Sequence, residues 1–212
     1  MSNKELNALF SEWKQKYPKY KGKFISDGII DEDEYNLANK KILFIAKEAN
    51  SPNQSAGDFR TWWPKGVRDN FSYRLCEWAY GILKDFPPLE DMDKDRASYI
   101  KKIAFMNLKK IGGGSTVDYK ALSQVVTDEA QFIKRQIDII RPQIIVGGVG
   151  REKYWTSIFN GIQFNPSKYD VKIARYGEYR IIHFYHPSYR VPRAMSYSLL
   201  EKVFNSEAFN KL

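Results

Sequence analysis

Ile42-Leu43-Phe44-Ile45 decides the fold class, because four consecutive apolar side chains are typical of a strand buried on both faces. Similar apolar runs occur at residues 103–108 and 143–150, and the last of these ends in glycines. Helical patterns at residues 67–84 and 127–140 separate the three runs. Strands that alternate with helices predict a three-layer α/β/α fold with a central, mostly parallel sheet.

The other elements extend this core at both ends of the chain. We expect an amphipathic helix at residues 4–16, a loop at 57–64, a surface connection at 85–98, a hairpin of strands 170–175 and 179–184 joined at Gly177, and a C-terminal helix. The length of 212 residues fits one domain spanning 1–212, in which residues 1–40 form a helical extension and edge elements.

Composition narrows the possible classes of protein. A hydrophobic fraction of 43% predicts a folded chain. No signal-peptide core or membrane-length apolar stretch is visible, and the single cysteine, Cys76, can form neither an internal disulfide nor a zinc or iron–sulfur site by itself. These features predict a protein of the reducing cytoplasm that has no membrane partner.

The net charge of +9 is concentrated in the last third of the chain. Residues 134–212 hold thirteen Lys or Arg and six acidic residues, whereas residues 1–133 hold twenty-one and nineteen. A basic surface of this kind suits phosphate contacts, although it is equally compatible with a merely solvated face.

Polar residues follow three of the apolar runs. They are Lys47 to Asn50, Asn107 to Lys110 and His186 to Ser188. Ligands of open α/β sheets bind beyond the carboxyl ends of the strands, so these positions are the first candidates for a site.

The order and spacing of these segments resemble the uracil-DNA glycosylase superfamily over residues 42–193. The matching segments are 42–51, the strand-borne Asn107, 136–150 and 183–190, of which His186-Pro187-Ser188-Tyr189-Arg190 is the most specific. The resemblance implies the fold of that superfamily, a three-layer α/β/α domain. It also implies an enzyme that hydrolyses the N-glycosidic bond of a damaged or deaminated base flipped from DNA. The first motif departs from the family, because Ala49 stands where its most active branch has Asp, and Lys47 replaces the usual glycine.

The resemblance also implies a catalytic role for the first and last of these segments. His186 would stabilise the departing base by a hydrogen bond or a positive charge. Glu48 and its neighbour Asn50 lie in the water-activating segment, where a carboxylate could orient water and stabilise an oxocarbenium-like sugar. The alternatives are a histidine that caps a strand end, and a Glu48 that only pairs with Lys47 or Arg60.

Base and strand contacts complete the implied site. Asn107 would read the base edge, since one amide offers both a donor and an acceptor, or it could be a turn-forming residue. Three aromatic side chains could stack on an extruded base: Phe59, Trp62 and Trp63. Core packing is the alternative for at least one of the two tryptophans. Contacts to the nucleic-acid strand are expected from Lys109, Lys110, Ser188, Tyr189, Arg190 and Arg193.

Cofactors and metals are not expected. Gly112-Gly113-Gly114 and Gly147-Gly148-Val149-Gly150 lack the spacing of nucleotide-binding loops, and His183 and His186 would point to opposite faces. The expected partner is DNA, single-stranded DNA or RNA, and the expected state is a monomer. Two alternatives to a DNA glycosylase stay open: a non-catalytic nucleic-acid-binding protein of the same fold, and a hydrolase of small nucleosides or other glycosides.

Overall fold

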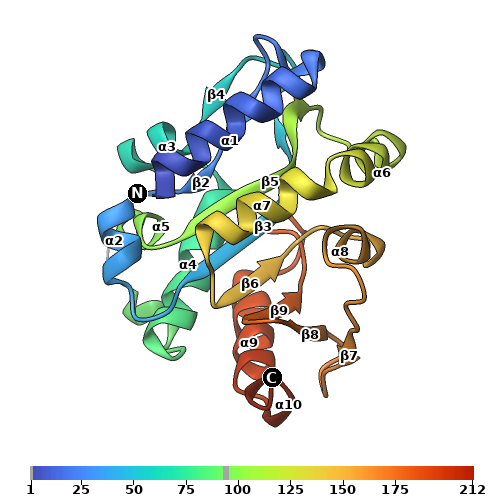
Figure 1. The fold of residues 1–212 in the computed structure, drawn as a ribbon. Helices are drawn as coiled ribbons and strands as arrows, with labels where there is room; N and C mark the ends of the chain where they lie inside the picture. The colour runs from blue at the N-terminus through green and yellow to red at the C-terminus, as the bar shows by residue number, and fades with distance from the viewer. Residues whose placement is uncertain (1, 93–95) are drawn as a thin grey trace.

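A seven-stranded sheet forms the centre of the computed structural model, which describes residues 2–92 and 96–212 (Figure 1). The strand order is β2-β5-β3-β6-β9-β8-β7. The strands are β2 (Gly28–Ile29), β3 (Ile42–Asn50), β5 (Ala104–Gly113), β6 (Ile144–Gly147), β7 (Asn165–Pro166), β8 (Lys172–Tyr176) and β9 (Tyr179–His183). A separate parallel pair consists of β1 (Ile25–Ser26) and β4 (Gly57–Asp58).

The four central strands, β5, β3, β6 and β9, run parallel, and the strands outside them pair antiparallel. Phe44 is the partner of Phe105 on one side and of Val146 on the other. The three apolar runs therefore form adjacent strands. The expectation of a mostly parallel central sheet is confirmed.

Helices cover both faces of the sheet. One face packs against α4 (Asn70–Lys84), α5 (Ala97–Lys101), α9 (Arg193–Phe204) and α10 (Glu207–Asn210). The other face packs against α1 (Ser2–Lys16), α6 (Tyr119–Asp128), α7 (Ala130–Ile140) and α8 (Lys153–Ile158), and α1 and α7 cross in front of the sheet in Figure 1. The remaining helical segments are η1 (Pro18–Tyr20), α2 (Glu32–Leu37), α3 (Phe59–Trp62), η2 (Trp63–Lys65) and η3 (Leu89–Asp91).

The chain reverses direction across the sheet at β3. It passes from β3 through α4 and α5 to β5 on one side, and then through α6 and α7 to β6 on the other. Strand order that reverses in this way leaves a crevice at the carboxyl ends of the strands, where ligands of α/β proteins bind.

Two central strands are longer than expected. β3 continues from Ile45 to Asn50 and β5 from Leu108 to Gly113, whereas β6 pairs only with the first part of β3. The segment 47–50, which we expected to follow the first strand, is therefore part of that strand. The extension persists because β3 and β5 still pair with each other there, with Glu48 opposite Lys109.

Other boundaries also differ from expectation. The segment expected as a loop at 57–64 contains α3, whose first turn is capped by the Asp58 carboxylate. Asp69 likewise caps α4, which starts at Asn70 and not at residue 67. The helix expected at 127–140 is α7, which starts at Ala130, preceded by the last two residues of α6. The break between them is at Glu129, which leaves helical geometry and buries its carboxylate against Trp13 and Tyr20.

The hairpin at Gly177 is confirmed, with β8 and β9 paired antiparallel on either side of it. The expected connection at 85–98 contains η3 and the start of α5, and its residues 93–95 lie outside the described part of the chain. Within the described residues, no helix combines the length and the apolar character needed to cross a membrane.

Candidate functional site

A cavity of about 760 Å³ opens at the carboxyl ends of β3 and β5, under the loop that follows β9. The predicted site residues that line it are Glu48, Asn50, Phe59, Trp62, Trp63, Asn107, His186, Ser188 and Arg190. Predicted site residues up to 142 positions apart in the chain, from 48 to 190, thus meet at one opening. The volume lies in the range of small-molecule sites, roughly 300–1,000 Å³.

Asn107 lies on β5 with its side chain on the same face as Phe105, at the floor of the cavity. Its residue exposure is 2%, and neither its Oδ1 nor its Nδ2 has a hydrogen-bond partner among the described residues. A buried polar group without a partner costs about 1–3 kcal/mol. Asn107 is therefore a strand residue with a free donor and a free acceptor, and the turn-forming alternative is wrong.

His186 follows β9 and lies against the ring of Phe71, with ring centroids 5.4 Å apart. Its Nδ1 accepts the backbone N–H of Ser188 at 3.2 Å. Burial, helped by the positive charge of Lys47, lowers the pKa of His186 to about 4. At neutral pH the ring is therefore uncharged, and because Nδ1 is an acceptor, the proton is on Nε2. The lowered pKa and the bond to Ser188 favour the hydrogen bond over the positive charge as the role of this histidine.

The backbone of Gly148 makes room for the histidine segment. A Cβ at Gly148 would lie 2.8 Å from Cα of His186 and 2.9 Å from the carbonyl oxygen of Tyr185. Such contacts are closer than real Cβ atoms tolerate. The glycine-rich end of the 143–150 run is thus needed for close approach of two backbones.

Glu48 lies on β3 with its side chain 4% exposed, and its Oε2 accepts from Nζ of Lys109 at 2.5 Å. The pairing with Lys47 or Arg60 that we considered is wrong, since Arg60 pairs with Asp58 and Lys47 lies over the ring of Tyr119. A carboxylate oxygen of Glu48 also lies against Gly113, where a Cβ would come within 2.2 Å of it. The Glu48 carboxylate thus lies between the ammonium group of Lys109 and the backbone of Gly113, which has no side chain.

Aromatic rings form one wall of the cavity. Phe105 on β5 contacts Trp63 at 4.7 Å, Phe59 at 5.1 Å and Phe71 at 5.6 Å between ring centroids. Trp63 is only 6% exposed, so core packing of one tryptophan is confirmed, whereas Trp62 is 43% exposed at the rim. An apolar wall facing a polar floor fits a flat, heterocyclic ligand.

The basic residues expected to contact nucleic acid fall into different environments. Lys110 is fully buried on the opposite face of β5, where its Nζ donates to Asp27 at 2.6 Å, so this prediction is wrong. The reason is strand alternation, which turns Lys110 toward the α1 and α7 layer and Lys109 toward Glu48. Lys109 is 17% exposed and Arg193 is ion-paired with Glu77.

The loop after β9 carries the most accessible of these residues. Tyr189 is 56% exposed and stacks on Tyr185, with ring centroids 5.2 Å apart. Arg190 and Ser188 are exposed and border the cavity. Asn50 is exposed at its other edge.

Sequence reasoning missed several residues of the lining: Ile25, Ser51, Asp69, Asn70 and Phe71. Phe71 lies in the segment that the sequence predicts as a helix at 67–84, and only tertiary packing shows that its ring meets His186. The available signal was the capping residue Asp69, which marks the start of α4 and therefore the place where the helix meets the sheet edge.

Within residues 2–92 and 96–212, no three His, Cys, Asp or Glu side chains gather closely enough to hold a metal ion. His183 accepts from Nε1 of Trp155 at 2.9 Å on the α8 side, so the two histidines do point to opposite faces.

Comparison of the sequence with models of protein families found no match, and comparison with curated proteins found none.

Proposed function

We propose that this protein binds a nucleobase extruded from a nucleic-acid strand and hydrolyses its N-glycosidic bond, as the resemblance to uracil-DNA glycosylases implies. The observation that carries the proposal is the buried, unpartnered amide of Asn107 in a cavity walled by aromatic rings. A base edge that presents a carbonyl next to an N–H would pair with both amide atoms. A site built for such pairing rejects ligands that lack it.

His186 suits the stabilisation of a leaving base. A neutral ring with its proton on Nε2 is a hydrogen-bond donor, and it can donate to a base oxygen that becomes negative as the bond breaks. The neutral ring performs this role without the repulsion that Lys47 would impose on an imidazolium.

Glu48 suits the water side of the reaction. The oxygen of a water molecule would attack C1′ of the sugar while the C1′–N bond breaks and leaves its electron pair on the base. The proton of the water passes to the Glu48 carboxylate, and the base anion takes up a proton from solvent after release. The ion pair with Lys109 orients the carboxylate, and its negative charge favours the oxocarbenium character of the sugar.

Base release from oligonucleotides tests the proposal. Single- and double-stranded labelled oligonucleotides carrying uracil, hypoxanthine, xanthine or an oxidised pyrimidine are incubated with the protein and cleaved with alkali at abasic sites. We expect strand breaks with at least one substrate, and their loss in His186→Ala and Glu48→Gln. His183→Ala is the matched control, because that histidine faces away from the cavity.

A second function, binding of nucleic acid without catalysis, is favoured by the Glu48–Lys109 ion pair, which already engages the carboxylate. It would give salt-dependent binding to all the oligonucleotides with no base release. Turnover of free nucleosides with no oligonucleotide binding would instead identify a hydrolase of small glycosides. Neither binding nor release on any of these substrates would refute both nucleic-acid proposals.

A further inference from the structure

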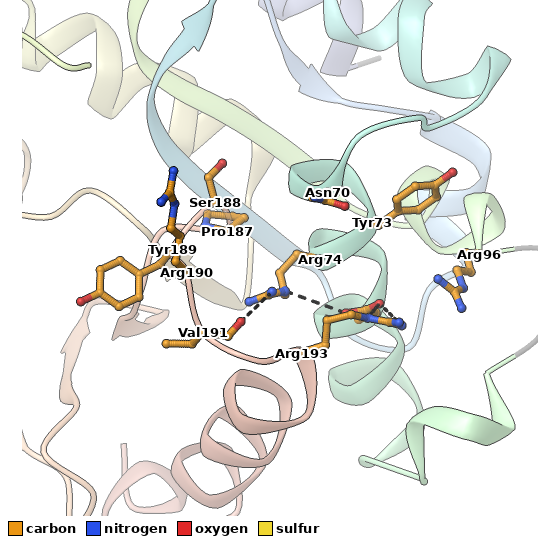
Figure 2. Close-up of a pocket in the computed structure, with 11 residues that line it drawn as sticks. Asn70, Tyr73, Arg74, Arg96, Pro187, Ser188, Tyr189, Arg190, Val191 and Arg193 are labelled. Atoms are coloured by element: carbon orange, nitrogen blue, oxygen red, sulfur yellow. Dashed lines mark hydrogen bonds and ion pairs between the residues drawn. The ribbon is translucent and has the colours of Figure 1, made fainter. Parts of the chain in front are cut away.

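A second pocket of about 310 Å³, which we call the arginine pocket, lies beside the cavity between α4 and the loop that leads into α9 (Figure 2). Four arginines and one carboxylate line it: Arg74, Arg96, Arg190, Arg193 and Glu77. Four positive charges against one negative charge leave an excess of three positive charges around a small opening. Such a lining favours an anionic ligand.

The buried carboxylate of Glu77 contacts two of the arginines, Arg193 and Arg74. Its side chain is 1% exposed, it accepts from Nε of Arg193 at 2.6 Å, and its second oxygen lies 4.0 Å from Nε of Arg74. A buried carboxylate between two guanidinium groups reduces their mutual repulsion and limits the rotation of both side chains.

Arg74 is held on further sides as well. It donates from one terminal nitrogen to Oγ of Ser196 at 3.0 Å and from the other to the carbonyl oxygen of Val191 at 3.2 Å. Figure 2 shows this side chain between α4, which carries Asn70 and Tyr73, and the loop that carries Ser188 and Val191. Each terminal nitrogen of a guanidinium carries two N–H groups, so one on each remains for a ligand. The group is preorganised.

Arg96 and Arg190 have no ion-pair partner among the described residues. Their charges are therefore available to a ligand, whereas the charge of Arg193 is largely compensated by Glu77. Guanidinium groups match the oxygens of a phosphate in shape and charge.

We propose that the arginine pocket binds the phosphate group of a nucleotide unit whose base occupies the cavity. The two openings share Asn70, Ser188 and Arg190, so one ligand can reach both. This inference rests on the proposed function for the identity of the base, while the phosphate contact itself depends only on the arginines.

Arg96→Gln is the discriminating variant, because Arg96 lines the arginine pocket and not the cavity. Binding of a fluorescently labelled single-stranded oligonucleotide is measured by anisotropy over a range of salt concentrations. We expect Arg96→Gln and Arg190→Gln each to weaken binding roughly 5-fold at low salt. Each should also reduce the slope of log K against log salt by about 0.7, as loss of one phosphate contact does.

Arg180→Gln is the control, since it removes the same charge at the other end of the sheet, where Arg180 is the partner of Ile144. Arg96→Gln and Arg190→Gln variants that bind both the oligonucleotide and uridine monophosphate as Arg180→Gln does would overturn the proposal. Thermal unfolding of each variant checks that the fold is kept. Arg74 is not substituted, because it pairs with the buried Glu77.

Two further arms identify the source of the phosphate and separate this inference from the proposed function. Uridine monophosphate and uridine are compared by NMR: Arg96-dependent binding of the monophosphate without Arg96-dependent binding of oligonucleotide would identify a free nucleotide as the source. Base release is recorded with the same variants. Binding that depends on the arginines, without any base release, would support the phosphate-binding proposal and refute catalysis. Base release together with binding that is unchanged by Arg96→Gln and Arg190→Gln would refute the phosphate-binding proposal alone.

Discussion

The Asp27 carboxylate accepts the backbone N–H of Asn107 at 2.8 Å. β2 begins at Gly28, so the side chain of Asp27, the residue just before it, takes the place of a further strand residue beside β5. The other oxygen of Asp27 accepts from Lys110 at 2.6 Å and from Gln136 at 2.7 Å. A fully buried charge network thus supports the backbone of the residue whose amide forms the floor of the cavity.

Removal of one charge from this network should be costly. Asp27→Ala leaves Lys110 buried without a counter-charge, and we expect the free energy of unfolding to fall by about 3–5 kcal/mol. The double variant Asp27→Ala, Lys110→Met should be less destabilised than the single one, because no charge is then left unpaired. Urea unfolding checks both, and a double variant as unstable as the sum of the two single variants would contradict this account.

Asn107→Leu should separate stability from function. The unpartnered amide is replaced by an apolar side chain of similar size, so we expect the free energy of unfolding to rise by about 1 kcal/mol while base release is lost. Gln136→Leu is the matched control, since Nε2 of that buried amide is bonded to Asp27 and its loss should destabilise. An Asn107→Leu protein that is less stable than the wild type would indicate a structural role.

Gly113→Ala should displace the Glu48 carboxylate, because the added Cβ would lie 2.2 Å from one of its oxygens. We expect base release to fall at least tenfold, which corresponds to about 1.4 kcal/mol in the barrier. Gly114→Ala is the control, as no heavy atom lies within 4 Å of a Cβ there. Equal activity of the two variants would show that the position of Glu48 does not matter for the reaction.

NMR of the two histidines should show His186 neutral, with its proton on Nε2, down to a pH near its pKa of about 4. The unfolded chain has the ordinary value of 6.5 and binds more protons between these limits. The stability that neutral His186 contributes is therefore complete above pH 6.5 and is lost as the pH falls toward about 4. His183→Gln assigns the signals, and a His186 that titrates near 6.5 would contradict the burial effect.

The sequence by itself determined the layers of the fold. Apolar runs such as 42–45 and 143–147 are continuous because both faces of a central strand are covered, and this local pattern is visible without any partner. The rule that ligands lie at the carboxyl ends of such strands was enough to bring Glu48, Asn107 and His186 to one cavity.

Only the tertiary structure decided what each of these side chains can do. Lys110 is buried because Asp27, 83 residues earlier, supplies its counter-charge. Glu48 pairs with Lys109 because β3 and β5 continue together past the end of β6, and the pKa of His186 is lowered because the surrounding chain partly buries the ring. Strand length, charge pairing and desolvation all depend on residues distant in the chain, and a local pattern of residue types does not contain them.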